Sequence, residues 1–236
     1  MSFLFAYAHA QRVGAEFQCP PWIGEEVFNL PKYGRPDGRE LPVRSELDLK
    51  PDETDVCIRG YSQNHQACIY TKRQAQEWLH LKHLIKYTID ADYWNDRIVA
   101  HYRRGDFQGY SYPLLSAKSY HDACISHGLA KWTEYGTLEP KFIFVSEENP
   151  TPFPDGIVYE GMPSFIPDFH RMVCAPVLLR ANSSFSWVAG LLNNGRVFSP
   201  LVKGLKGGEE HHITFVEGNH CALSDLACGS DMHLPE

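Results

Sequence analysis

Two adjacent arginines have the side-chain chemistry to bind a phosphate group. They lie in the run His-Tyr-Arg-Arg-Gly-Asp at residues 101–106, directly after the apolar stretch Ile-Val-Ala at 98–100. A guanidinium group matches two phosphate oxygens at once and stays charged at any physiological pH. In sugar transfer, such a charge beside the β-phosphate stabilises the departing nucleoside diphosphate. We expect Arg103 and Arg104 to hold a diphosphate; a structural ion pair with Asp106 is the competing interpretation.

A second phosphate-binding pattern lies about eighty residues downstream. Asn182, Ser183 and Ser184 precede the apolar run that begins at Phe185, which predicts the N-terminus of a helix over 184–192. The free N–H groups and the positive end of the dipole make a helix start a natural phosphate site. Plain N-capping of the helix is the competing interpretation.

Two carboxylates are further candidates for contacts with a bound nucleotide. Glu147 follows an apolar stretch at 142–145 and Ser146, and Asp168 opens a predicted helix over 167–175. A carboxylate in a nucleotide cleft accepts the N–H donors of guanine. Each of the two also suits a helix cap or a turn, and Glu147 is in addition a candidate acceptor contact or catalytic base.

Several aromatic and histidine side chains complete the candidate set. Tyr110, Tyr112 and Tyr120 follow the arginine loop and offer rings for stacking on a sugar or a base, and Tyr110 is a further candidate for the acceptor side. His211 and His212 lack cysteine or carboxylate partners at ligand spacing, so we expect a solvated pair and no metal site there.

The elements that position these residues alternate along the second half of the chain. Strands are predicted at 98–100, 142–145, 177–179 and 197–198, and helices at 117–131, 167–175 and 184–192. This alternation predicts an α/β protein with a Rossmann-like parallel sheet, whose ligands bind at the carboxyl ends of the strands.

The first half of the chain is less regular. The sequence predicts a helix over 3–13, an irregular stretch over 19–55, a strand at 56–58 and an amphipathic helix within 70–89. We expect two domains, an N-terminal acceptor-side region at 1–96 and a nucleotide-sugar-binding domain at 97–236.

Composition narrows the function classes. The net charge of −7 argues against broad binding to nucleic acid or anionic membranes. Seven cysteines without a Cys-x-x-Cys pair favour reduced thiols and no zinc site. No stretch is apolar over the roughly 20 residues of a membrane span, and the first ten residues lack the basic leader of a signal peptide. We therefore expect a cytoplasmic protein without a membrane span.

Taken in order, the motifs resemble those of the α-1,2-fucosyltransferases (glycosyltransferase family 11), relatives of the α-1,6- and protein O-fucosyltransferases. The family's His-x-Arg-Arg-x-Asp matches residues 101–106, and its strand ending in Ser and two acids matches 145–148. Its Asp-x-x-x-Met run matches 168–172, and Asn-Ser-Ser-Phe-Ser-Trp matches 182–187. A Gly-aromatic-x-Gln block resembles 60–63, so the matches keep their order over roughly residues 55–200.

The resemblance implies a GT-B-like enzyme that needs neither metal nor cofactor and inverts the anomeric centre. It implies transfer of fucose from GDP-fucose to a glycan hydroxyl, with galactose as the acceptor and an α-1,2 linkage. Arg103 or Arg104 would contact the β-phosphate, and His101 and Asp168 would lie near guanine. The other donor-binding residues would be Asn182, Ser183, Ser184 and Phe185. We expect Asp106 to be the base, because it shares a loop with the arginines.

The beginning of the chain departs from the family pattern. Family members open with a strand and a Gly-Gly-Leu-Gly-Asn-Gln loop before a helix that starts Met/Leu-Phe-x-Tyr-Ala. Residues 1–8 resemble that helix without the strand and loop, so we expect a short or N-terminally truncated member. A catalytically silent GDP-sugar- or glycan-binding protein is therefore one alternative. A metal-dependent glycosyltransferase that uses Asp90 and Asp92 is the other.

Overall fold

The computed structural model describes residues 1–60, 68–82, 97–105, 112–134, 138–139, 142–146, 156–160 and 165–219. The chain divides into two compact units, and the division falls between Leu84 and Ile85. The predictions for Asp90, Asp92, Asp106, Tyr110 and Glu147 lie outside the described residues.

The N-terminal unit is built on an aromatic cluster. Helix α1 (Ser2–Val13) ends at Gly14, whose φ of 68° is a left-handed conformation that glycine adopts without strain. The ring of Phe3 packs on Phe17 and Trp22, with centroids 5.4 and 5.1 Å apart, and Tyr7 packs on Trp78 at 5.0 Å. Short elements surround this cluster: α2 (Gly24–Val27), β1 (Phe28–Asn29), β2 (Val43–Arg44), β3 (Cys57–Ile58), α3 (Lys72–Trp78) and β4 (His80–Leu81).

The long helix predicted within 70–89 is wrong in its extent. Helix α3 starts at a capping box between Thr71 and Gln74 but ends at Trp78. The chain then enters β4, which pairs antiparallel with β1 in the register Phe28↔Leu81. The apolar periodicity was real, but pairing with a strand fifty residues away decided the conformation of His80 and Leu81, and short-range patterns cannot report such a partner.

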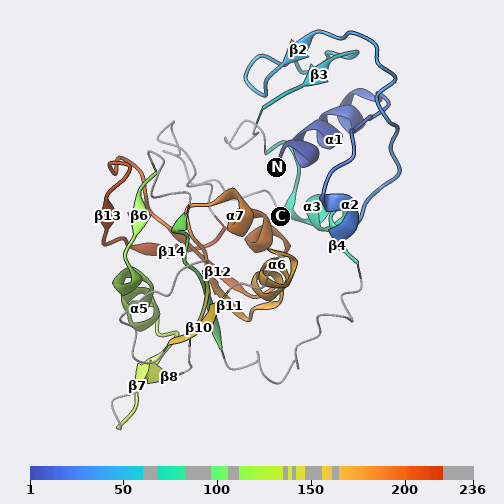
Figure 1. Cartoon of the computed structure of the whole chain (residues 1–236). Helices are drawn as coiled ribbons and strands as arrows, with labels where there is room; N and C mark the ends of the chain where they lie inside the picture. The colour runs from blue at the N-terminus through green and yellow to red at the C-terminus, as the bar shows by residue number, and fades with distance from the viewer. Residues whose placement is uncertain are drawn as a thin grey trace. The chain divides into compact units, whose positions relative to one another are not determined.

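The C-terminal unit contains, among the described residues, a six-stranded sheet in the order β10-β9-β5-β11-β12-β14 (Figure 1). Its strands are β5 (Ile98–His101), β9 (Phe142–Ser146), β10 (Gly156–Glu160), β11 (Val177–Leu179), β12 (Arg196–Pro200) and β14 (Phe215–Glu217). The first five pair in parallel, and β14 pairs antiparallel with β12.

The order of the parallel strands determines where a ligand is expected. Numbered along the chain, the parallel strands run third, second, first, fourth, fifth, which is the order of a doubly wound sheet. The direction of winding reverses between β5 and β11, which pair in the register Leu179↔Ala100. In such sheets ligands bind outside the carboxyl ends of the strands at this reversal. The two predicted phosphate-binding motifs follow these two strands.

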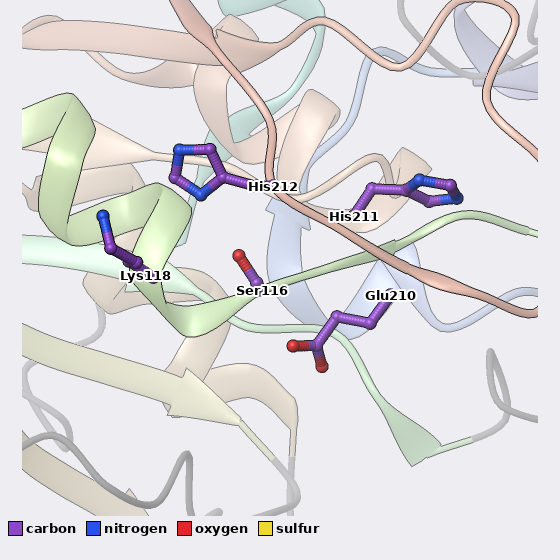
Figure 2. A pocket seen from close by; sticks show the side chains of 5 residues that line it. All are labelled: Ser116, Lys118, Glu210, His211 and His212. Carbon is purple, nitrogen blue, oxygen red and sulfur yellow. The ribbon is translucent and has the colours of Figure 1, made fainter.

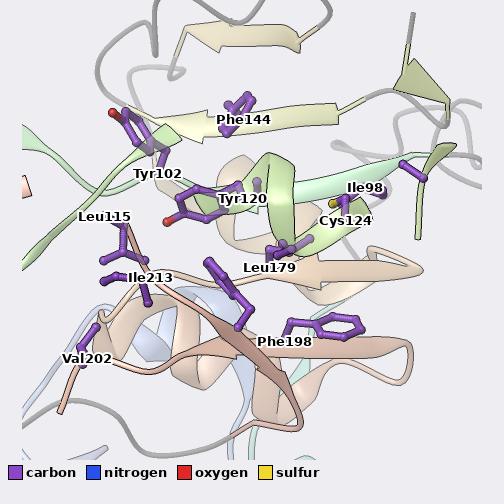
Figure 3. Packing of buried hydrophobic residues seen from close by; sticks show 14 residues of the cluster. Ile98, Tyr102, Leu115, Tyr120, Cys124, Phe144, Leu179, Phe198, Val202 and Ile213 are labelled. Carbon is purple, nitrogen blue, oxygen red and sulfur yellow. The ribbon is translucent and has the colours of Figure 1, made fainter. Parts of the chain in front are cut away.

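Helices cover both faces of the sheet. Helix α5 (Ala117–Ser126) lies on one face, whereas α6 (Phe165–Cys174) and α7 (Ser184–Leu192) pack together on the other (Figure 1). The buried cluster under α5 includes Tyr120, which meets the rings of Tyr102 and Phe144 edge-on at 5.9 and 6.0 Å (Figure 3). Ile98 and Ala100 belong to the same cluster, so the even-numbered residues of β5 face α5.

Most predicted elements of this unit are confirmed, and the differences have local causes. Helix α5 ends at Ser126 and not at 131, because Gly128 takes a left-handed φ of 63° and Leu129 N–H bonds the carbonyl of Cys124 at 2.8 Å. Tyr120 is fully buried, so the suggestion that it stacks on a ligand is wrong. Strands β10 and β14 were not predicted. The remaining short strands are β6 (Leu114–Leu115), β7 (Lys131–Trp132), β8 (Leu138–Glu139) and β13 (Glu210–His211).

Two further predictions concern the whole chain. The helices within the described residues are all too short or too polar to cross a membrane. Among these residues, the cysteines that are not joined in disulfides are Cys19, Cys57, Cys68, Cys124 and Cys174.

Candidate functional site

The two motifs predicted to bind phosphate meet at the carboxyl edge of the sheet, where the strand order reverses. The ring of His101, the last residue of β5, lies edge-on to the ring of Phe185 in the first turn of α7, with centroids 5.8 Å apart. Because β5 and β11 are neighbouring parallel strands, the residues that follow them leave the sheet side by side. The motifs predicted from separate parts of the sequence therefore lie together at one edge of the sheet.

His101 is held neutral at this edge. Its side chain is almost fully buried, at 4% exposure. Burial, together with the positive charges of Arg103 and Arg180, lowers the pKa of His101 to about 3. Its ring atom Nδ1 has no hydrogen-bond partner among the described residues. A neutral imidazole with an unused ring nitrogen can donate to or accept from a ligand, depending on its tautomer.

The two arginines of the motif interact with different groups. Arg104 lies over the ring of Tyr102, with its guanidinium carbon 4.6 Å from the ring centroid, and its Nη2 bonds the Tyr102 hydroxyl and Glu210. Its side chain is 11% exposed. The positive charge of Arg103 instead acts on His101, where it lowers the pKa of the imidazole.

The alternation of side chains along an extended chain accounts for this divergence. Even-numbered residues of β5 face α5, and Tyr102 packs on Tyr120 of that helix. Arg104 follows Tyr102 to the α5 side, whereas His101 meets α7 on the other side. Glu210 is 106 residues away from Arg104 in the sequence, so only the tertiary structure shows this ion pair.

The start of α7 uses its polar side chains in part for structure. Ser183 is the N-cap, and its hydroxyl accepts from the Phe185 N–H at 3.3 Å. Asn182 donates from Nδ2 to the carbonyl of Pro113 at 3.0 Å, which leaves its buried Oδ1 without a partner among the described residues. The hydroxyl of Ser184 makes no hydrogen bond within the part of the chain that the structure describes, and its side chain is half-buried. Of the two serines, Ser184 is the one with a hydroxyl available for a ligand.

Helix α6 brings a carboxylate and two aromatic rings to the same edge. Phe169 and Phe165 pack on Phe185, with centroids 5.4 and 5.9 Å apart, and Phe165 is 45% exposed. Asp168 accepts a 2.8 Å ion-pair hydrogen bond from Arg171 Nη1. Burial raises the pKa of Asp168, and the charge of Arg171 opposes that rise. Asp168 lies in the first turn of α6 and is held by an ion pair that the sequence did not predict, while Phe165 and Phe169 pack on the ring of Phe185.

A buried arginine that the sequence analysis did not identify lies under the site. Arg180 follows β11 directly and is 0% exposed. Its Nε donates to Ser199 Oγ at 2.8 Å, and Ser199 in turn donates to the Gly218 carbonyl at 2.6 Å. The positive charge of Arg180 acts to lower the pKa of both His101 and Tyr120. The sequence signal for Arg180 is its position directly after a central strand, but the residue lies outside every motif described above.

The described residues contain no group of three or more His, Cys, Asp or Glu side chains arranged to hold a metal ion. The arrangement they do contain combines a neutral imidazole, an arginine and a capped helix start around an aromatic ring. Such an edge can bind an anionic group together with a flat apolar ring.

Comparison of the chain with protein-family models, with curated proteins and with solved structures finds no match in any of the three.

Proposed function

We propose that this protein binds a guanosine-diphosphate sugar at the reversal point between β5 and β11 and transfers its sugar to a glycan hydroxyl. The observation that carries the proposal is the contact between His101 and Phe185, which brings the two phosphate-binding motifs to one edge. The proposed enzyme is an inverting, metal-independent fucosyltransferase of GT-B-like architecture. Its donor is GDP-fucose and its acceptor a glycan galactose.

The described contacts support a division of roles. Arg103 and the start of α7, with the free hydroxyl of Ser184, hold the diphosphate. The aromatic rings around Phe185 provide an apolar surface for the base, and His101 supplies an uncharged hydrogen-bonding group. In the reaction, the acceptor oxygen attacks the anomeric carbon while the bond from that carbon to the β-phosphate oxygen breaks. The acceptor proton passes to a carboxylate, for which Asp106 is our candidate.

The donor-binding proposal is tested by measuring thermal shifts with a panel of nucleoside diphosphates and nucleotide sugars. We expect stabilisation by GDP and GDP-fucose, and not by UDP, ADP or CDP at equal concentration. A ligand at 100 times its Kd stabilises the folded state by about 2.7 kcal/mol, which such a scan detects. An equal response to all diphosphates, or no response to any, would reject guanosine recognition.

A catalytically silent binding protein is the second candidate, and one observation favours it. Arg104 is engaged by Tyr102 and Glu210, so one of the two predicted catalytic charges is already compensated. Calorimetric binding of GDP without sugar transfer or donor hydrolysis, over a panel of glycan acceptors, would favour this candidate over the enzyme.

A further inference from the structure

A pocket of about 510 Å³ opens on the α5 side of the C-terminal unit. Its lining residues are polar or charged: Ser116, Lys118, Glu210, His211 and His212 (Figure 2). Small-molecule sites commonly have volumes of about 300–1,000 Å³. The expectation that His211 and His212 form a simple solvated pair is incomplete, because both line this pocket.

Backbone contacts hold the two walls of the pocket together. Strand β13 pairs in parallel with β6, and the Ser116 N–H donates to the His211 carbonyl at 2.9 Å. A second bond joins the same two segments, since the Ile213 N–H donates to the hydroxyl of Ser119 at 2.8 Å. The first turn of α5 and the segment at 210–213 are therefore fixed to each other, and the pocket does not depend on side-chain positions alone.

The lining suits an uncharged ligand that carries several hydroxyl groups. Lys118 is paired with Asp122, and His212 Nε2 lies 3.3 Å from the same carboxylate. Glu210 is paired with Arg104 through Oε2. Since each charge has an opposite neighbour, the pocket offers no excess charge to select an ion, and its lining combines polar groups with the apolar stems of the same side chains. Donors and acceptors arranged at close spacing match the hydroxyl groups of a sugar.

Glu210 is the residue best placed to bind such hydroxyl groups. Within the described part of the chain, its Oε1 has no hydrogen-bond partner, whereas its Oε2 is held by Arg104. In Figure 2 the imidazoles of His211 and His212 point in opposite directions. The carboxylate that would bind the ligand is thus paired directly with Arg104.

We propose that this pocket binds the acceptor saccharide, with Glu210 accepting hydrogen bonds from its hydroxyl groups. The acceptor role rests on the proposed function, but the binding of a saccharide is separate from it. The arginine pair then lies between two sites, with Arg103 on the donor side and Arg104 on the acceptor side. The sequence-based expectation gave residues 1–96 a part of the acceptor cleft, and this proposal adds a pocket of the C-terminal unit.

The test is saturation-transfer-difference NMR on the full chain, with the methyl glycosides of galactose, glucose, mannose and N-acetylglucosamine as probes. At least one glycoside should bind. Glu210→Gln should weaken its binding about tenfold or more, because a charge-assisted hydrogen bond is lost. Ser116→Ala should weaken it less. Lys203→Met, an exposed lysine of the same segment outside the pocket, is the matched control and should bind like the parent. Thermal unfolding must show that each variant is folded at the temperature of the NMR measurement.

The outcomes separate the pocket from the donor site. Absence of binding by all four glycosides, or equal binding by the parent and Glu210→Gln, would overturn the proposal. So would binding of inorganic phosphate that disappears in Lys118→Met, since the pocket would then be an anion site. GDP binding is measured by calorimetry on the same samples. Glycoside binding without GDP binding keeps the pocket and rejects the proposed function, and the reverse result rejects the pocket alone.

Discussion

The hydroxyl of Tyr120 on α5 donates a 2.7 Å hydrogen bond to the backbone carbonyl of His101. Both residues are buried, and the bond joins the helix on one face of the sheet to the end of the central strand β5. His101 in turn contacts Phe185 on the other face. The position of the candidate site is therefore set by contacts from both helical layers.

Tyr120→Phe should destabilise the fold without removing the site. The substitution keeps the ring contacts but leaves the buried His101 carbonyl without its donor, a loss of about 1–3 kcal/mol. Urea unfolding at pH 7 measures the change. Tyr7→Phe, a buried tyrosine of the other unit, is the control and should change stability by less than about 0.5 kcal/mol. Equal effects of the two substitutions would show that the Tyr120 hydroxyl bond contributes nothing specific.

Arg103 and Arg104 should differ in their effect on donor binding. Arg103→Met is expected to weaken GDP binding by about 1.5–3 kcal/mol, or roughly tenfold to a hundredfold, as a charge-assisted phosphate contact is lost. Arg104→Met should weaken it less, because Arg104 is engaged by Glu210 and Tyr102. Isothermal calorimetry measures both affinities.

The matched control for the arginine pair is Arg196→Met. Arg196 also forms an ion pair, with Glu217, but at the amino end of β12 and therefore at the opposite edge of the sheet. Its substitution should leave GDP affinity unchanged. If Arg103→Met binds GDP as tightly as Arg196→Met does, Arg103 is not a phosphate ligand and the site assignment is wrong.

The adjacent serines at the start of α7 should separate stability from binding. Ser183→Ala removes the N-cap and should cost about 1 kcal/mol of stability. Ser184→Ala should leave stability nearly unchanged but lower GDP affinity several-fold, because its hydroxyl is not used by the described structure. Urea unfolding and calorimetry on both variants give the two numbers. A loss of affinity only in Ser183→Ala would indicate that the helix start, and not a serine hydroxyl, binds the ligand.

His101 should make the fold sensitive to acid. The folded pKa of about 3 lies below the unfolded value near 6.5, so the unfolded chain binds an extra proton between these values. Stability from this group is full above pH 6.5 and falls as pH drops toward 3, by about 2 kcal/mol at pH 5 relative to pH 7.

Urea unfolding at pH 7 and pH 5 tests this dependence. His101→Gln should lose about 2 kcal/mol less between the two pH values than the parent does. His80→Gln replaces an exposed histidine and should keep the dependence of the parent. If the parent and His101→Gln respond equally to pH, the imidazole of His101 is not held neutral by the fold.

The sequence by itself determined the local parts of this protein. Apolar runs such as Val177–Leu179 and the Asn-Ser-Ser stretch before α7 specify a strand and a helix start through interactions within a few residues. The alternation of strands and helices predicted a parallel sheet with its ligands at the carboxyl edge, and the α/β class is confirmed. The donor and the reaction stay predictions.

Only the tertiary structure decided which residues meet at that edge. Adjacent arginines look equivalent in sequence, yet side chains alternate along an extended chain, and Glu210, 106 residues away, pairs with Arg104. The same holds for β4, whose strand conformation depends on pairing with β1. Contacts of this kind join segments that are distant in the chain, and local spacing carries no record of them.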